Sequence, residues 1–165
     1  MTALFALVRS IVVGTAFVWL WTMVGLWARQ FDRVFGGPLP SWTGPFGVVA
    51  LAAGVPLMLT CVVLFAIRGK GTPAPFDPPR TFVAFGPYRA VRNPMYIGGW
   101  LTIVGFAFVT QSSSVLVFSF AWLLLVHLFV VLYEEPTLTE KFGAPYDRYR
   151  ATVPRWIPIR KLVNG

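Results

Sequence analysis

Four long apolar stretches decide what this chain can fold into, and they cover residues 11–28, 46–67, 94–110 and 115–133. An α-helix rises about 1.5 Å per residue, so roughly 20 apolar residues cross a hydrocarbon core about 30 Å thick. Hydrophobic residues make up 56% of the 165 residues and charged residues only 12%, which lies outside the range of soluble domains. The sequence therefore predicts an all-α membrane protein, a polytopic helical bundle with about four transmembrane helices.

The chain reads as a single membrane domain with two unequal halves. Residues 1–67 hold two spans and no motif, and residues 68–165 hold the polar motifs. The first stretch lacks the small-residue cleavage pattern of a signal peptide, so we expect it to remain as a helix. The link at 111–114 is short and uncharged. The third and fourth helices should therefore form an antiparallel hairpin, after which Pro136 should stop or restart the helix.

The basic residues predict the orientation in the membrane. With the N-terminus inside, only Arg29 and Arg33 of the 14 Lys and Arg residues fall outside, which is a strong positive-inside bias. The net charge of +8 then reflects topology and lipid headgroups rather than nucleic acid, because the basic residues flank apolar stretches. Both termini and the polar motifs are expected in the cytoplasm. The cytoplasmic set is Arg9, Arg68, Lys70, Arg80, Arg89, Arg92, Lys141, Arg148, Arg150, Arg155, Arg160 and Lys161.

The third helix has a distinctive start. Asn is a favoured N-cap and Pro a favoured first helical residue, so Asn93-Pro94 predicts a helix that begins at Pro94. To Thr110 it rises only about 24 Å, which is short for a full crossing and indicates a start sunk in a protein-lined cavity. Arg92 and the free N–H groups of this helix start would suit an anion. Alternatively, Arg92 serves only the positive-inside rule and lipid phosphates.

Three ionisable residues near the end of the fourth helix are candidates for chemistry. Glu134 and Glu135 are adjacent carboxylates at a helix end that is already negative, so they need cations nearby. They either pair with arginines of the C-terminal tail or hold a cationic ligand group. His127, the single histidine, precedes Glu134 by seven residues and should share its face. It is either functional or hydrogen-bonded across to another helix.

The remaining polar side chains give weaker signals. Aromatic residues near the cytoplasmic face would stack on a heterocycle or shelter a cation, although interfacial aromatic belts need no ligand. Cys61 is the single cysteine, so neither an intrachain disulfide nor a Cys/His metal site is expected. The aromatic candidates are Tyr88, Tyr96, Trp100, Tyr146 and Tyr149.

Taken together, these motifs resemble a known superfamily. The stretch from Gly86 to Gly98, then Glu134-Glu135-Pro-Thr-Leu138, Phe142 to Tyr149, and Val153-Pro-Arg-Trp-Ile-Pro158 occur in the order seen in isoprenylcysteine carboxyl methyltransferases and phospholipid methyltransferases. The resemblance covers about the C-terminal half. It departs from the family at Asn93, where the family usually has His, so no titrating imidazole is expected there.

The resemblance implies S-adenosylmethionine as cofactor, in a pocket that faces the cytoplasm. Glu134 or Glu135 would hold its ammonium and Arg92 its carboxylate. For a carboxylate acceptor, Arg155 would orient the acid, whereas an amine acceptor would lose its proton to Glu134, Glu135 or His127. The implied cofactor-binding residues are Gly86, Pro87, Tyr88, Arg92, Asn93, Pro94, Tyr96, Gly98, Glu134, Glu135, Tyr146 and Tyr149, and the implied catalytic residues are Glu134, Arg155 and His127.

The expected activity is methyl transfer to a lipophilic acceptor that reaches the pocket from the bilayer. A prenylated cysteine carboxylate is the leading acceptor class, with a phospholipid amine next. A membrane sterol-type reductase that uses NADPH is a second enzymatic reading. However, Arg89 and Arg92 offer few cationic side chains for the phosphates of NADPH. A membrane scaffold without catalysis is the third. Membrane lipids are expected partners, a metal is not, and the sequence does not indicate an oligomeric state.

Overall fold

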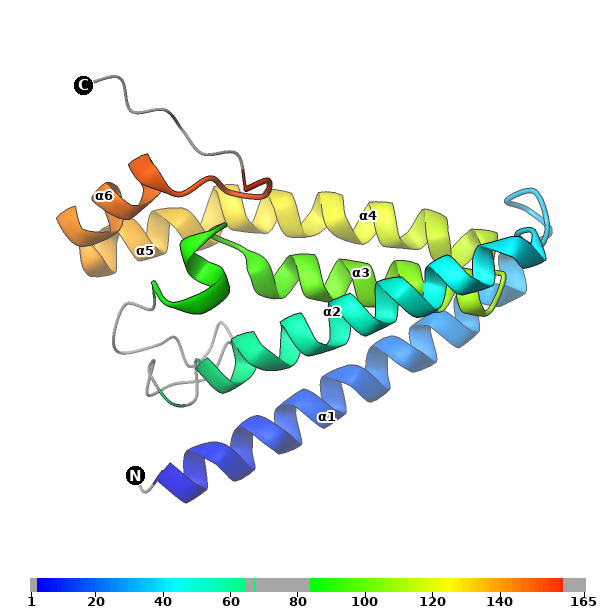
Figure 1. The fold of residues 1–165 in the computed structure, drawn as a ribbon, viewed down its shortest axis with the longest axis horizontal. Helices are drawn as coiled ribbons and strands as arrows, with labels where there is room; N and C mark the ends of the chain where they lie inside the picture. The colour runs from blue at the N-terminus through cyan, green and yellow to red at the C-terminus, as the bar shows by residue number, and fades with distance from the viewer. Residues whose placement is uncertain (1–2, 65–66, 68–83, 159–165) are drawn as a thin grey trace.

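The computed structural model describes residues 3–64, 67 and 84–158, and within these ranges it contains helices and no β-strand. Residues 68–83, with Arg68, Lys70 and Arg80, lie outside the described residues, as do Arg160 and Lys161. Four main helices form the bundle: α1 (Ala3–Ala28), α2 (Gly44–Leu64), α3 (Pro94–Val109) and α4 (Ser113–Phe129). Helices α2, α3 and α4 lie side by side, while α1 converges on them only toward its C-terminal end (Figure 1).

Two helical segments in the described chain are long and apolar enough to cross a membrane. They are Ser41–Leu64 and Ser113–Phe142, and Pro94–Val109 is a shorter apolar helix. The start of α3 at Pro94 is as predicted. The number of four spans remains a prediction, because length and composition single out two helices.

Glycines bring α2 and α3 into close contact. A Cβ atom at Gly54 would lie 2.7 Å from the carbonyl oxygen of Gly98, and one at Gly98 would lie 2.8 Å from the backbone nitrogen of Met58. Gly47 and Gly105 repeat this contact two turns away, with 2.8 and 2.9 Å to each other's carbonyl oxygens. Small residues let membrane helices approach at backbone distance. Gly98, expected to contact a cofactor, therefore lies in the α2–α3 interface.

Asp32 joins the two loops at the end of the bundle where α1 finishes. Its Oδ1 accepts hydrogen bonds from the Ser112 hydroxyl at 2.7 Å and from the Ser114 hydroxyl and N–H at 2.6 and 3.0 Å. Burial alone would raise the pKa of Asp32, but the hydrogen bonds from Ser114 and Ser112 outweigh it, and the net pKa is lowered. This contact ties the α1–α2 connection to the α3–α4 link.

The fourth helix continues past Pro136 through a π-helical turn. The turn spans Val130–Glu134 and leads directly into α5 (Glu135–Phe142). A proline ring collides with the carbonyl four residues earlier, here that of Leu132, and a wider π turn gives it room. The helix therefore continues through Pro136. The extra residue in the π turn changes the direction in which the side chains of α5 point, compared with a regular α-helix.

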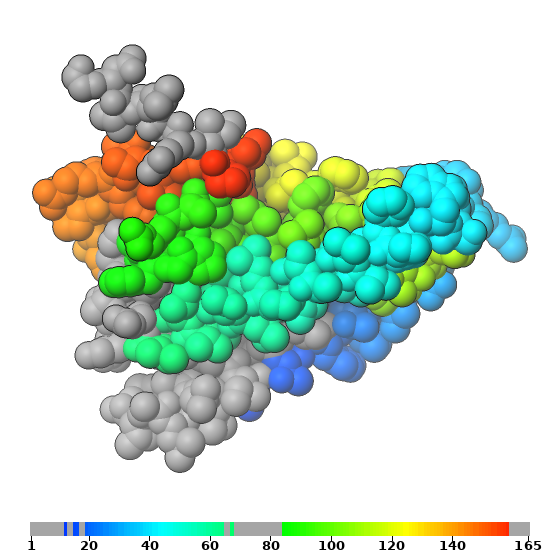
Figure 2. Space-filling model, viewed as in Figure 1, coloured from blue at the N-terminus to red at the C-terminus, as the bar shows by residue number. Residues whose placement is uncertain are grey.

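The described part of the C-terminal tail, up to residue 158, contains two short helices and folds back. After α5, the chain turns at Gly143 (φ +56°) into α6 (Ala144–Thr152). Residues 153–158 then return toward the start of α3 and the outer side of α4 (Figure 1). The surface of these C-terminal segments adjoins that of the 3-10 turn Gly86–Arg89 (Figure 2). The polar motifs therefore gather at one end of the bundle.

Candidate functional site

Glu135 is the centre of the polar cluster at this end. Its side chain is 7% exposed, and Arg155 binds both oxygens, with Nε to Oε1 at 2.7 Å and Nη2 to Oε2 at 2.9 Å. Arg92 Nη1 lies 3.0 Å from the same Oε1. The hydrogen bond with Glu135 raises the pKa of Arg155. Of the two predicted readings of Glu135, the structure shows the pairing with a tail arginine.

Arg92 is buried and still has hydrogen-bonding capacity. Its side chain is only 10% exposed. Its contact with Glu135 is not aligned as a hydrogen bond, and neither Nε nor Nη1 has a hydrogen-bond acceptor among the described residues. Buried donors of this kind cost free energy unless a ligand or water satisfies them. Arg92 is therefore a buried cation whose Nε has no acceptor in the described part of the chain, and this N–H suits an anion.

Asn93 is the N-cap residue of α3, as predicted, but its side chain does not bond the helix. Its side chain makes no cap hydrogen bond, and its Nδ2 donates instead to the carbonyl oxygen of Arg155 at 3.3 Å. The backbone N–H of Arg92 donates to the carbonyl oxygen of Pro154 at 2.9 Å. The predicted N-cap position is confirmed, but the side-chain amide binds the returning tail and makes no cap hydrogen bond. These two contacts fix the tail against the start of α3.

Tyr96 and Glu134 form a second polar pair beside Arg92. The Tyr96 hydroxyl donates to Glu134 Oε2 at 3.1 Å. Both side chains are partly buried, and the Tyr96 ring contacts Trp122 with 6.4 Å between ring centroids. Glu134 Oε1 makes no hydrogen bond that the structure records within the described residues. Glu134 is thus the carboxylate better placed to receive a cation.

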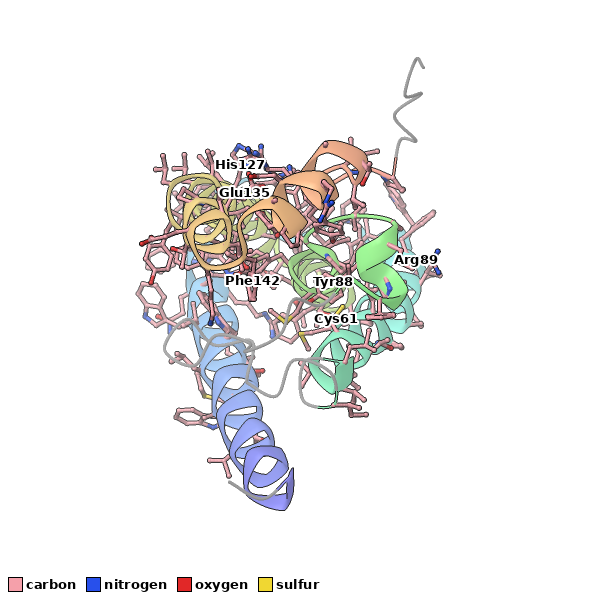
Figure 3. The ribbon with its side chains drawn as sticks, turned by 90° about the vertical axis from the view of Figure 1, so that its left-hand side faces the viewer. Cys61, Tyr88, Arg89, His127, Glu135 and Phe142 are labelled. Atoms are coloured by element: carbon pink, nitrogen blue, oxygen red, sulfur yellow. The ribbon has the colours of Figure 1, made fainter. Side chains whose placement is uncertain are left out.

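His127 lies on α4, eight residues before Glu135 and seven before Glu134. The prediction that His127 shares the face of Glu134 is wrong, because the π turn between them adds one residue and brings Glu135 to that face. Figure 3, which looks along the bundle, places His127 and Glu135 toward the same side, although eight residues separate them along the helix. Trp156 Nε1 donates to His127 Nδ1 at 3.0 Å, so a neutral ring carries its proton on Nε2. His127 therefore anchors the tail.

The 3-10 turn Gly86–Arg89, which precedes α3, packs against the residues of the site. Tyr149 donates its hydroxyl hydrogen to the carbonyl oxygen of Tyr88 at 2.6 Å. Tyr88 is buried next to Cys61, and burial raises the pKa of Tyr88 and Tyr149 (Figure 3). Gly86 has φ +56°, and a Cβ there would lie 3.1 Å from Leu64 Cδ1. These residues, with Pro87 at the start of the turn, hold the site in place.

Tyr146 lies close to Glu135 and Arg92. It is 3% exposed, and its pKa is raised first by burial and then by Glu135, while Arg92 opposes the shift. Arg89 is exposed and points outward at the edge of the molecule (Figure 3). The structure therefore separates Arg92, which faces the cluster, from Arg89, which does not.

Trp122 and Trp156 belong to the site region but were not predicted. Trp156 was visible in the Val153–Pro158 motif, yet its partner His127 is 29 residues away in sequence. Trp122 had no signal beyond its place in an apolar stretch. Both follow from how the tail and the helices pack.

Comparison with known proteins agrees with the motifs. The family model of phospholipid methyltransferases matches residues 43–145, well over half of the chain. The chain belongs to this family. The match spans α2 to the start of α6 and contains Arg92, Glu134 and Glu135, whereas Arg155 and Trp156 lie beyond it. The superfamily inferred from the motifs is thereby confirmed.

A curated relative adds a second likeness within the methyltransferases. The chain is 28% identical over 149 residues to a protein named methanethiol S-methyltransferase from Crocosphaera subtropica (strain ATCC 51142 / BH68). The aligned part covers 86% of this phospholipid methyltransferase family member but 54% of the relative, so the chain spans about half the length of that protein. No solved structure matches the chain.

Proposed function

We propose that this protein transfers a methyl group from S-adenosylmethionine to a lipophilic acceptor that enters from the bilayer. The observation that carries the proposal is Arg92, a buried arginine whose Nε and Nη1 have no acceptor in the described part of the chain. A carboxylate would accept a hydrogen bond from Nε, while Nη1 stays in its ion pair with Glu135. Membership of the phospholipid methyltransferase family supports the assignment of S-adenosylmethionine as the cofactor.

The amino-acid end of the cofactor would lie between Arg92 and Glu134. Its carboxylate would bind Arg92 and the N–H groups at the start of α3, and its ammonium would bind Glu134. Glu135 holds Arg92 in place through the 3.0 Å ion pair. Tyr96 orients the Glu134 carboxylate through its hydroxyl. The residues present therefore fit both charges of this group.

When bound, the cofactor would supply a sulfonium methyl group for transfer to an acceptor lone pair, with the electrons of the methyl–sulfur bond left on sulfur. The protein's contribution is alignment of donor and acceptor and exclusion of water. Glu134 is committed to the ammonium, and His127 Nδ1 is occupied by Trp156 at 3.0 Å. Neither is therefore free to remove a proton.

The absence of a free base among these candidates favours an acceptor that is already an anion. A carboxylate, as in the prenylated cysteine class, or a thiolate needs no proton removal. A phospholipid amine is the runner-up, since it must first lose a proton. Orientation of an acceptor carboxylate by Arg155 would require Arg155 to release Glu135, because its Nε and Nη2 both bind that residue.

Ligand binding to the detergent-purified protein tests the proposal. Calorimetry should show binding of S-adenosylmethionine and none of NADPH. Arg92→Ala and Glu134→Gln should each weaken it, and Arg89→Ala, on the exposed neighbour, should not. Stabilisation by NADPH alone would support the reductase reading, and stabilisation by neither ligand would support the scaffold reading.

We also propose that this site faces the cytoplasm, as the distribution of Lys and Arg indicates. A cysteine placed at Pro158 in a Cys61→Ser background should react with a membrane-impermeant maleimide only after the cells are opened. A cysteine at Gly36, at the other end of the bundle, should react in intact cells. The reverse pattern would place the site outside.

A further inference from the structure

A cavity of about 150 Å³ lies among α1, α2, α3 and α4. Its lining includes Trp21, Gly25, Met58, Gly99, Phe118 and Trp122. One of its few polar neighbours, Thr102, donates its hydroxyl to the carbonyl oxygen of Gly98 at 2.8 Å within its own helix. The cavity is partly open at the surface of the bundle, and an apolar space of this size can take up apolar molecules such as benzene.

The cavity lies directly next to the proposed methyl-transfer site. Gly99 follows Tyr96 by three residues, so it sits about one turn, roughly 4.5 Å, deeper along α3. Trp122 contacts the Tyr96 ring on one side and the Trp21 ring on the other, with 6.4 Å between centroids in both pairs. The wall that Trp122 forms is therefore shared between the polar pair Tyr96–Glu134 and the cavity.

Two glycines keep side chains out of the space. A Cβ at Gly99 would lie 3.3 Å from Trp122, and a Cβ at Gly25 would lie 3.2 Å from Phe106. Both rings line the cavity. Larger residues at these positions would push the rings or fill the space, so the cavity depends on the glycines of α1 and α3.

Building on the proposed function, we propose that this cavity binds the apolar group of the methyl acceptor and selects acceptors whose apolar group is about the size of benzene. A group of that size fits within about 150 Å³, and a nucleophile at the Gly99 end of the cavity would lie about one helical turn from Tyr96. A long acyl or prenyl chain exceeds that volume and must leave most of its length outside. The acceptor class is therefore a compact apolar anion, such as an aryl thiolate.

The test uses thiophenol as a compact probe and 1-hexadecanethiol as a long one, with the full chain in nanodiscs. Ile103→Phe and Met58→Phe add volume to the lining, and Val117→Phe adds the same kind of ring on a position that is 45% exposed and outside the lining. Three quantities are measured for each variant: the Kd of S-adenosylmethionine alone, the 129Xe NMR signal of cavity-bound xenon, and the KM for methylation of each thiol.

We expect thiophenol to be the better acceptor of the two. Ile103→Phe and Met58→Phe should each raise its KM at least tenfold and remove the xenon signal, with the Kd of S-adenosylmethionine changed less than twofold. Val117→Phe should match the wild type in all three. An unchanged thiophenol KM in both filling variants, or a preference for 1-hexadecanethiol, would overturn the inference. Absence of S-adenosylmethionine binding in the wild type marks failure of the proposed function itself, and the acceptor assignment falls with it.

Discussion

Arg92 differs from the other arginines because burial and unsatisfied donors coincide in one side chain. Arg92→Lys keeps the positive charge but loses the planar fork and the Nε donor. Hydrogen bonds to charged groups contribute about 1.5–3 kcal/mol, so S-adenosylmethionine should bind roughly 10- to 150-fold more weakly. Calorimetry checks this, with Arg89→Lys on the exposed neighbour as control. Wild-type affinity in Arg92→Lys would mean that charge alone, without the fork, holds the ligand.

The residue types at the site could be predicted from the sequence, but their pairing could not. Arg92, Glu134 and Glu135 stood out as charges beside apolar stretches. That Glu135 binds Arg155 while Glu134 binds Tyr96 depends on the rotation of the helix at these two positions and on the return of the tail. Neither is a local property of the chain, so no spacing rule reveals it.

At the scale of elements, the π turn explains why the prediction that His127 and Glu134 share one helix face is wrong. A regular α-helix places residues seven apart on one face, which predicts His127 with Glu134. The inserted residue in Val130–Glu134 moves Glu135 to that face. Pro136 was the visible cause, since a proline inside a long helix requires some local adjustment. The sequence indicated where the helix would adjust but not how.

The contact between α2 and α3 can be tested with two glycines of the same helix. A Cβ at Gly54 would lie 2.7 Å from the Gly98 carbonyl oxygen, whereas a Cβ at Gly44 has nothing within 4 Å. Because backbone atoms cannot move aside cheaply, Gly54→Ala should lower the free energy of unfolding by about 1–3 kcal/mol. SDS titration followed by circular dichroism measures this. Gly44→Ala should be neutral or slightly stabilising, and equal losses in both would show that the close approach is unimportant.

The loop contact at Asp32 should make stability depend on pH. The pKa of Asp32 is lowered in the folded state, since the hydrogen bonds from Ser114 and Ser112 outweigh burial. Its stabilising effect is therefore complete above the unfolded pKa near about 3.9 and is lost as pH falls through the lower folded pKa. Asp32→Asn should be less stable than wild type at pH 6, and the difference should narrow at pH 3. Thermal unfolding at both pH values measures it, and a constant difference would contradict the assignment.

At the scale of the whole molecule, the sequence predicts the apolar helices of the bundle more completely than the arrangement of its polar end. Long apolar stretches dictate helices because a backbone in lipid must satisfy its own hydrogen bonds. The polar tail carries no such constraint. Its helices α5 and α6 and its return at residues 153–158 are set by contacts with residues far away in sequence, such as Asn93 with Arg155 over 62 positions.

The tail completes the site, and two truncations test this at the scale of the molecule. Ending the chain after Val153 removes the Arg155 contacts to Glu135, the Pro154 contact to the Arg92 backbone and the Trp156 contact to His127. Ending it after Pro158 keeps all three. Because none of these contacts joins the bundle helices to one another, both truncated proteins should retain helical circular dichroism. S-adenosylmethionine should bind only the longer one, since Glu135 without Arg155 would draw Arg92 into a closed pair. Binding to the shorter protein with wild-type affinity would show that the site is complete within α3, α4 and α5.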